Sequence, residues 1–262
     1  MIGKKGKIKK FTSSEEALTE VVDFTITLGI MLLALGVIGV YGYPMLEHMK
    51  DAGHLENIEQ SFSVLKPNMN KVVYGKAPSQ SVELKMHGGS VAVTGTSYMN
   101  ITMRAWNESS SSEEEVSIER QLRMIQNDFV DTSIAYENTG AWAKYPRGSA
   151  IAISKPDFAY DGNTLVIPVV TISGSKSMSG SSLIRIIADG GQLSISRYEN
   201  VSNVNITIMS EYYNGWERYL SDSIGMQILD VDANNNTFTA GRSFSPNIDV
   251  ITTMSPMSVT IE

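Results

Sequence analysis

The sequence has no cysteine and only three histidines among its 262 residues. A chain without thiols forms no disulfide, holds no cysteine-ligated zinc or iron–sulfur centre, and has no thiol nucleophile. The histidines, His48, His54 and His87, are few for a metal centre, and no glycine-rich phosphate loop, HExxH or GxSxG motif is present. We therefore predict no catalytic residue, no metal site, no cofactor and no enzymatic activity.

Positive charge is also scarce, with 21 basic against 28 acidic side chains and a net charge of −7. An acidic protein binds the polyanionic backbone of nucleic acids poorly, so we predict no nucleic-acid partner. The basic side chains are unevenly distributed, because five of them lie in the first ten residues: Lys4, Lys5, Lys7, Lys9 and Lys10.

One stretch, residues 24–46, has no charged side chain and is mostly apolar. A helix of this length reaches about 34 Å, which crosses a hydrocarbon core about 30 Å thick, so we predict a single transmembrane helix. Lysines crowd the preceding leader, residues 1–23, and the positive-inside rule places this leader in the cytoplasm and the rest of the chain outside. A cleavable secretory signal is the alternative, but its apolar core is only about 7 to 15 residues long.

Residues 47–76, which follow the span, contain an apolar repeat at helical spacing. Intervals of three and four residues separate Leu55, Ile58, Phe62, Leu65, Met69 and Val72. This pattern is typical of a helix that buries one face, and it covers too few heptads for a coiled coil, so we expect packing on the chain's own domain. Pro67 interrupts the repeat and predicts a kink or break between Lys66 and Pro67.

From residue 77 onward the apolar residues alternate with polar ones, which is the period of β-strands. Two segments, residues 82–93 and residues 184–195, each alternate around a Gly-Gly pair and predict two β-hairpins. Further strands are predicted at residues 99–105, 149–154, 165–173, 204–209, 225–231, 237–242 and 257–261. Helices are expected at residues 116–126 and 215–222, and a solvated loop at residues 109–115. The fold class is therefore mainly β with an N-terminal transmembrane α-helix: a long helix packed on a β-sandwich or a rolled antiparallel sheet, with residues 77–262 as an extracytoplasmic domain.

Two polar patterns are candidate sites. N-x-S/T acceptors for glycans occur at Asn100, Asn107, Asn200, Asn205 and Asn235, in keeping with an outward-facing domain. Asp230, Asp232 and Asn234 have the first spacings of a calcium loop, but the glycine and the bidentate glutamate that such a loop needs are missing. An Asx-rich turn is the expected structure there.

Aromatic residues gather between residues 212 and 219. Spacings of three and four place Tyr212, Trp216 and Tyr219 on one helical face, for which packing onto a sheet is the usual reason. An exposed platform for a sugar or a peptide is the alternative.

The N-terminal region resembles archaeal type IV pilins and related pilin-like membrane proteins in residues 16–44, EALTEVVDFTITLGIMLLALGVIGVYGYP. An uncharacterised archaeal pilin-like family is similar in residues 56–93, ENIEQSFSVLKPNMNKVVYGKAPSQSVELKMHGGSVAV. The same family is similar to the shorter segments DTSIAYENTGA, FAYDGNTLVIPVV and GWERYL. The resemblance therefore extends over the whole chain, through motifs of low individual specificity.

In pilin-like families a membrane prepilin peptidase removes the basic leader, and the freed helix packs among its neighbours in a filament. The resemblance implies that Ala17 ends the leader and that Leu18 begins the mature chain. Glu20 or Asp23 would then neutralise the new amine of an adjacent subunit. Glu15 and Glu16 stand where basic residues are typical, so an uncleaved single-pass anchor stays the alternative.

Four glycines lie along the predicted span: Gly29, Gly36, Gly39 and Gly42. Small residues let helix backbones approach closely in lipid, so we predict self-association, or association with other pilin-like subunits, through the membrane helix. The predicted function is a membrane-anchored archaeal pilin-like surface protein with a structural, assembly or adhesion role. A single-pass surface receptor or binding module for a peptide or glycan is the alternative.

Overall fold

The computed structural model of the chain describes the backbone of residues 9–107 and 111–262, and the side chains of residues 19–106 and 111–262. The chain divides into two units, residues 1–54 and residues 55–262. Three of the predicted leader lysines, Lys4, Lys5 and Lys7, lie outside the described residues.

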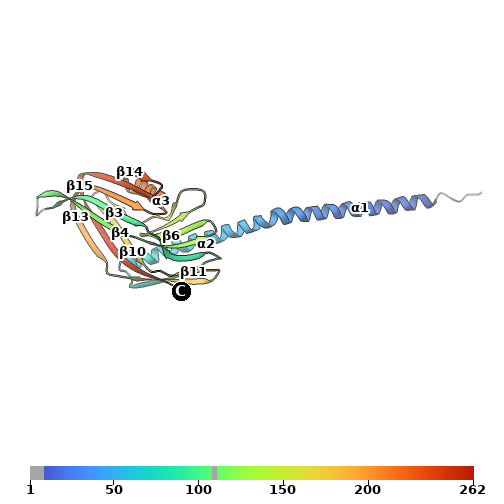
Figure 1. Cartoon of the computed structure of the whole chain (residues 1–262), viewed down its shortest axis with the longest axis horizontal. Helices are drawn as coiled ribbons and strands as arrows, with labels where there is room; N and C mark the ends of the chain where they lie inside the picture. Colours follow the sequence, from blue (N-terminus) through green and yellow to red (C-terminus); the bar gives the residue numbers. More distant parts are fainter. Residues whose placement is uncertain (1–8, 108–110) are drawn as a thin grey trace, which may run out of the picture. The chain divides into compact units, whose positions relative to one another are not determined.

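The first unit is helical, with α1 (Lys9–Val37), a π-helical turn η1 (Ile38–Gly42) and the start of α2 (Tyr43–Val73) (Figure 1). Within the described residues, one helix is long and apolar enough to be a candidate membrane span. It contains the predicted span, residues 24–46. The π-helical turn ends just before Pro44, whose missing N–H leaves a regular helix one hydrogen bond short.

The second unit begins inside α2 and contains its predicted apolar face. Five residues of the repeat, Ile58, Phe62, Leu65, Met69 and Val72, are buried, which confirms the predicted packing on the chain's own domain. Of the kink or break predicted at Pro67, the break is wrong, because α2 continues through this proline to Val73. The buried side chains on both sides of Pro67 hold the helical backbone against the loss of one hydrogen bond.

The larger sheet is mixed and is organised around its last strand, β15 (Thr237–Ile261). Its main order is β1-β12-β15-β13-β3-β4, and β10 and β14 also pair with β15 while β9 pairs with β10. The β10–β15 pair is parallel, whereas the other pairs are antiparallel. The remaining bounds are β1 (Ser79–Lys85), β3 (Tyr98–Asn107), β4 (Ser112–Gln121), β9 (Ala159–Tyr160), β10 (Thr164–Ser173), β12 (Leu183–Gly190), β13 (Ser194–Met209) and β14 (Gln227–Asp232).

The second sheet is antiparallel and has the order β11-β2-β5-β6-β7-β8. Its strands are β2 (Ser90–Thr94), β5 (Met124–Phe129), β6 (Thr132–Glu137), β7 (Gly140–Lys144), β8 (Ile151–Ser154) and β11 (Ser177–Ser179). A short helix, α3 (Tyr213–Tyr219), precedes a second π-helical turn, η2 (Leu220–Ile224). The predicted class, mainly β with a long N-terminal helix, is confirmed, and the one parallel pair is the departure from an antiparallel sheet.

Apolar side chains form two cores. One contains the buried face of α2 together with residues from both sheets, and the other surrounds α3, Trp142 and Trp216. Strands β6 and β7 contribute to both, because successive residues of a strand point to opposite faces of the sheet. Tyr136 belongs to the first core and Trp142 to the second.

Both predicted hairpins are wrong. β1 and β2 lie in different sheets, and β12 and β13 lie on opposite sides of β15. The two similar segments instead pair with each other, with Val82 opposite Ile186 and Leu84 opposite Ile184. Gly89 is packed against the carbonyl of Asp128, where a Cβ would collide, so this glycine serves a close approach between strands. Gly88 has a φ of 106° and turns the chain between β1 and β2.

Three other expectations differ from the structure. Residues 116–126, expected as a helix, lie mostly in β4 and β5, and residues 112–115, expected as part of a loop, already belong to β4. The helix-forming Glu and Arg residues there are overridden by continuous pairing of β4 with β3. The strands predicted at residues 237–242 and 257–261 belong to one long strand, β15. The helix expected at residues 215–222 is confirmed as α3 and the following turn.

Candidate functional site

The candidate site is a buried polar network at the tip of the β6–β7 hairpin, residues 137–140, hereafter the hairpin tip. Glu137, Asn138 and Thr139 have no exposed surface, which is unusual for a turn. Asn138 and Thr139 have φ values of 43° and 68°, in the left-handed region that a tight two-residue hairpin turn requires. Gly140 completes the tip, because a Cβ there would lie 2.9 Å from Pro156.

Asn138 holds the hairpin tip to the larger sheet. Its Nδ2 donates to the Pro168 carbonyl at 3.0 Å, and its Oδ1 accepts from the Val170 amide at 2.8 Å. Both partners belong to β10. The asparagine side chain thus takes the place of a neighbouring strand, satisfying backbone groups that would otherwise be buried without partners.

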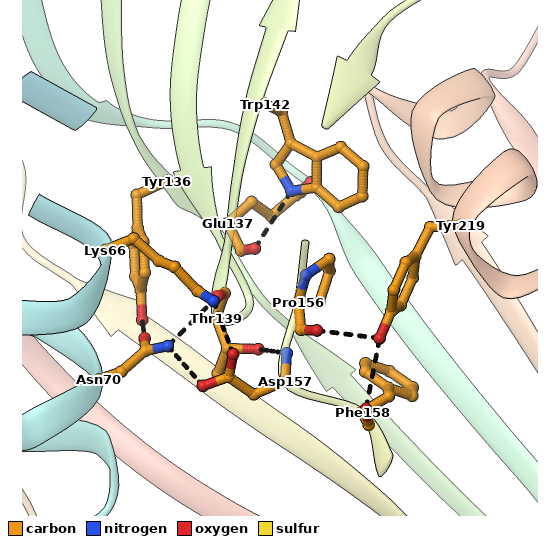
Figure 2. Close-up of polar contacts among 10 residues, drawn as sticks. All are labelled: Lys66, Asn70, Tyr136, Glu137, Thr139, Trp142, Pro156, Asp157, Phe158 and Tyr219. Atoms are coloured by element: carbon orange, nitrogen blue, oxygen red, sulfur yellow. Dashed lines mark hydrogen bonds and ion pairs between the residues drawn. The ribbon is translucent and has the colours of Figure 1, made fainter. Parts of the chain in front are cut away.

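Asp157, just after β8, joins the hairpin tip to α2 (Figure 2). Its Oδ1 lies 2.6 Å from Lys66 Nζ, and its Oδ2 accepts from Asn70 Nδ2 at 2.7 Å. Its own amide donates to Thr139 Oγ1 at 3.0 Å. Tyr136 Oη donates to Asn70 Oδ1 at 2.8 Å, which leaves the asparagine amide bonded on both sides.

Burial affects the charged and titratable groups of this network. The Lys66 side chain is 15% exposed and that of Asp157 is 35% exposed, so the ion pair is only partly screened by water. Burial, and then the nearby Asp157 carboxylate, raise the pKa of Tyr74 above its ordinary range. Burial also raises the pKa of Tyr136, so both phenols stay neutral hydrogen-bonding groups.

A second polar link lies earlier on α2. Tyr145, after β7, donates from Oη to Glu59 Oε1 at 2.6 Å. Burial, with the hydrogen bond to this carboxylate, raises the pKa of Tyr145 to about 12. Glu59, Lys66 and Asn70 therefore form a polar edge beside the apolar face of α2, and they fix its position on the sheet through directional bonds.

Glu137 is a buried carboxylate on the opposite side of the hairpin tip. It accepts from Ser210 Oγ at 2.8 Å and from Trp216 Nε1 at 2.9 Å, and its backbone carbonyl accepts from Trp142 Nε1 at 3.3 Å. Burial raises the pKa of Glu137, and the bonds from Trp216 and Ser210 oppose this rise. The carboxyl group joins α3 to the second sheet, and none of these partners is a base that would activate a nucleophile.

Replacing Glu137 with glutamine is expected to flatten the pH dependence of stability. The raised pKa means that the folded protein holds this proton where the unfolded chain, with a pKa of about 4.5, has released it. The contribution of Glu137 to stability is therefore full below that value and is lost as the pH rises through the folded pKa. Denaturant unfolding of the full-length chain in detergent should show a smaller loss of stability for Glu137→Gln than for the wild type as the pH is raised above 4.5.

The matched control is Glu56→Gln, which changes an exposed carboxylate that is not among the groups that shift the pKa of Glu137. It should leave the slope of stability against pH close to that of the wild type. Parallel profiles for the wild type and Glu137→Gln would contradict the assignment of a raised pKa to Glu137.

The aromatic cluster is core, as its helical spacing predicts. Tyr212 and Trp216 have no exposed surface and Tyr219 is 5% exposed. The Trp216 ring lies 4.6 Å from Trp142 and 5.9 Å from Phe158, measured between centroids. The alternative, an exposed aromatic platform for a sugar or peptide, is wrong, because these rings pack between α3 and the sheets.

The predicted membrane residues all lie on the helical first unit. Ala17 and Leu18 are in α1, but their side chains lie outside the described residues, and Glu20 is exposed. The glycines follow at positions 29, 36, 39 and 42. A Cβ built on Gly29, Gly36 or Gly39 meets nothing within 4 Å, so close packing inside the chain does not explain these three glycines.

The glycan acceptors differ in environment. Asn200 and Asn235 are exposed, Asn100 and Asn205 are half-buried, and the Asn107 side chain lies outside the described residues. The Asp230 to Asn234 segment forms the expected Asx turn, in which Asp232 Oδ1 accepts from the amides of Asn234 and Asn235. The side-chain hydrogen bond from Asn235, together with these amide bonds, lowers the pKa of Asp232. Within the part of the chain that is described, no three His, Asp or Glu residues are grouped closely enough to hold a metal ion.

A cavity of about 200 Å³ lies between the edge strand β8 and the α3–η2 segment. Its lining includes Lys155, Arg218 and Asp222. Lys155 Nζ donates to Ser223 Oγ at 3.0 Å. In the described part of the chain, neither Lys155 nor Arg218 pairs with a carboxylate, so the cavity offers two cations beside one acidic side chain.

Residues 17–253 match a family of unknown function, DUF7289. The chain belongs to this family. Two uncharacterized proteins of Archaeoglobus fulgidus are similar to parts of it. One is 30% identical over 78 residues, which cover 30% of this chain and 26% of that protein. The other is 20% identical over 184 residues, which cover 65% of this chain and 70% of that protein. No solved structure matches the chain.

The family match includes the hairpin tip and its partners on α2, none of which sequence reasoning identified as a site. A local signal existed, because the segment TSIAYENTGAWA places an Asn-Thr turn between two alternating runs. Nothing local marks Asp157 as the partner of Lys66, since 91 residues separate them in the sequence.

Proposed function

We propose that this protein is a membrane-anchored, pilin-like surface protein with a structural, assembly or adhesion role. In this proposal residues 24–46 span the membrane, the basic leader before them lies in the cytoplasm, and the β domain lies outside the cell. The function is contact or assembly rather than turnover.

The observation that carries the proposal is the exposure of apolar side chains along residues 21–49. Phe24, Leu33 and Leu35 are 69%, 69% and 65% exposed. Each such side chain gains about 1.5–3 kcal/mol when it leaves water, so this helix requires lipid or other helices around it. The lysines at the start of the chain support the orientation, because basic residues remain on the cytoplasmic side.

The hairpin-tip network supports a structural role. A surface protein that bears load through a membrane helix needs that helix to be firmly joined to its outer domain. Lys66, Asn70 and Glu59 make these joints with short polar bonds, and Phe62 and Leu65 add fully buried apolar contacts. The C-terminal part of α2 is thus held on the β domain by both apolar packing and directional hydrogen bonds. This combination favours one fixed arrangement of the segment from residue 55 onward.

Replacing Gly36 and Gly39 with leucine is expected to weaken self-association of the full-length protein in membranes. Neither glycine has a neighbour within 4 Å of a built Cβ, so leucine is accommodated within the chain itself. Leucine would hold neighbouring helix backbones apart in lipid, where close approach supplies the packing energy. The expected result is a severalfold loss of crosslinked oligomer in native membranes.

The matched control is Ala34→Leu. Ala34 lies two residues before Gly36, about 160° around the helix, so the leucine side chain falls on the opposite face. It should leave crosslinking unchanged. Equal crosslinking of the glycine variant and the wild type would count against assembly through this face.

Processing of the leader is tested separately by the intact mass of membrane-extracted protein. A mature chain beginning at Leu18 supports a processed pilin-like subunit. A chain that retains its lysines supports an uncleaved single-pass anchor with the same outer domain.

A second candidate function, a surface binding module for a peptide, is favoured by the cavity between β8 and α3. Ile151 supplies an apolar contact there, while Lys155 and Arg218 supply charge for a carboxylate. An edge strand with free backbone groups also suits an extended peptide. Loss of peptide binding in Arg218→Ala, with assembly intact, would favour this function over the first.

A further inference from the structure

The turn between β14 and β15 holds an acceptor sequence, Asn235-Asn236-Thr237, in an exposed position. Asn235 Nδ2 donates to Asp232 Oδ2 at 2.6 Å, and Thr237 Oγ1 donates to the Asn235 carbonyl at 3.1 Å. Asn236 has a φ of 51°, which turns the chain sharply between them. The Asn235 side chain is therefore exposed on one ordered turn, and the Thr237 hydroxyl lies next to it, bonded to the Asn235 carbonyl.

A polar cavity of about 170 Å³ begins at this turn. It is lined by Thr96, Ser97, Met124, Met209, Ser210, Glu211, Asn235 and Asn236. Hydroxyl, amide and carboxylate groups dominate this lining, and Met124 and Met209 add an apolar wall. Such a mixture of hydrogen-bonding groups and a small apolar surface suits a sugar ring, which has hydroxyls at its edge and C–H groups on its faces.

We propose that Asn235 carries an Asn-linked glycan whose first sugar lies over this cavity. The new bond joins Asn235 Nδ2 to the anomeric carbon of a lipid-linked sugar phosphate. The bond from that carbon to the phosphate oxygen breaks, the lipid phosphate leaves, and one Nδ2 proton is lost. The remaining Nδ2 proton can still donate to Asp232, so the turn keeps its shape after modification.

The structure distinguishes Asn235 from the other described acceptors. Asn205 lies within β13, between Thr102 and Gly241, and a Cβ on Gly241 would collide with its Oδ1. A sugar on Asn205 is therefore incompatible with the folded sheet. Asn100 is half-buried, and its Oδ1 accepts from Ser117 Oγ at 3.1 Å. Asn200 is exposed but does not line this cavity.

This inference rests on the proposed outward location of the β domain, because lipid-linked sugars are transferred on the outer side. The chain has no cysteine, so one introduced thiol reports location by itself. Val130 is 71% exposed in the β5–β6 turn and is far from Asn235 in the sequence. The Val130→Cys variant is therefore treated with a membrane-impermeant maleimide on intact cells, and its labelling is independent of any glycan.

The full-length chain is produced in a host that glycosylates N-x-S/T sites, and its proteolytic peptides are analysed by mass spectrometry. The Asn235 peptide of the wild type should carry a glycan mass that is lost in Asn235→Gln and Thr237→Ala and kept in Thr237→Ser. Asn200→Gln, the exposed control, should leave it in place. An unmodified Asn235 peptide in Val130→Cys protein that is labelled from outside would overturn the inference and leave the proposed location standing. Labelling of this variant only after permeabilisation would overturn both.

Contact of the sugar with the cavity is tested by enzymatic removal of the glycan. One or two lost hydrogen bonds correspond to a fall in Tm of about 2–8 °C for a domain of this size. The fall should be smaller in Glu211→Ala, which removes a carboxylate from the cavity lining. An unchanged Tm after deglycosylation of the wild type would show that the sugar does not contact the cavity.

Discussion

Replacing Trp216 with alanine is expected to lower the free energy of unfolding by at least about 4 kcal/mol. Truncation of a fully buried tryptophan costs about 3–5 kcal/mol through lost burial and the cavity left behind. Trp216 has no exposed surface and packs against Trp142. Its Nε1 also donates to Glu137 Oε2, so the variant leaves a buried carboxyl group one donor short, at a further cost of about 1–3 kcal/mol.

Two further variants test separately how much of this loss comes from the Nε1 hydrogen bond and how much from the burial of the ring. Trp216→Phe keeps most of the ring volume but loses the N–H, so its cost should be about 1–3 kcal/mol. Trp106→Ala removes a tryptophan that is 43% exposed and should cost about 1 kcal/mol or less. Denaturant unfolding followed by circular dichroism gives all three values. Similar losses for Trp216→Ala and Trp106→Ala would refute the role of Trp216 as the centre of this core.

Replacing Asp157 with alanine is expected to destabilise the fold by about 2–3 kcal/mol. Removing one partner of a buried ion pair costs about 3–5 kcal/mol, and the partial exposure of Asp157 reduces this value. Lys66 would be left without its carboxylate, and Asn70 Nδ2 would keep only its hydrogen bond of 3.3 Å to the Thr139 carbonyl. Because both residues belong to α2, hydrogen exchange should quicken in residues 62–73 more than in the strands.

A double-mutant cycle with Lys66→Met isolates the ion pair. The two substitutions together should cost less than the sum of the two alone, because the second removes the unpaired charge that the first creates. The exposed pair Arg185–Glu83 is the reference, and Glu83→Ala should change stability by about 1 kcal/mol or less. Additive effects of Asp157→Ala and Lys66→Met would mean that the pair does not hold α2 in place.

Local features of the sequence predict the helical part of this protein well. The candidate span and the apolar face from Ile58 to Val72 were read from hydropathy and spacing, which involve only neighbouring residues. Pro67 is the exception, because its local preference to end a helix is outweighed by buried contacts on both sides. Individual strands such as β3 and β10 were likewise predicted close to their observed bounds.

The partners of those strands could not be predicted in the same way. The Gly-Gly turns predicted hairpins, yet β1 pairs with β12 about 100 residues away. β4 reads as a helix in isolation and is a strand because β3 lies beside it. Strand pairing depends on register and burial over long sequence separations, and a local pattern contains neither.

The sequence by itself determined the apolar span, the basic leader, the buried face of α2 and the absence of thiol chemistry, since composition and periodicity decide these. Only the tertiary structure decided that the hairpin tip is buried, that Asp157 bonds Lys66 and Asn70, and that Asn205 is packed while Asn235 is exposed. The physical reason is that polar contacts act over about 3 Å, so they exist only where folding brings distant residues together.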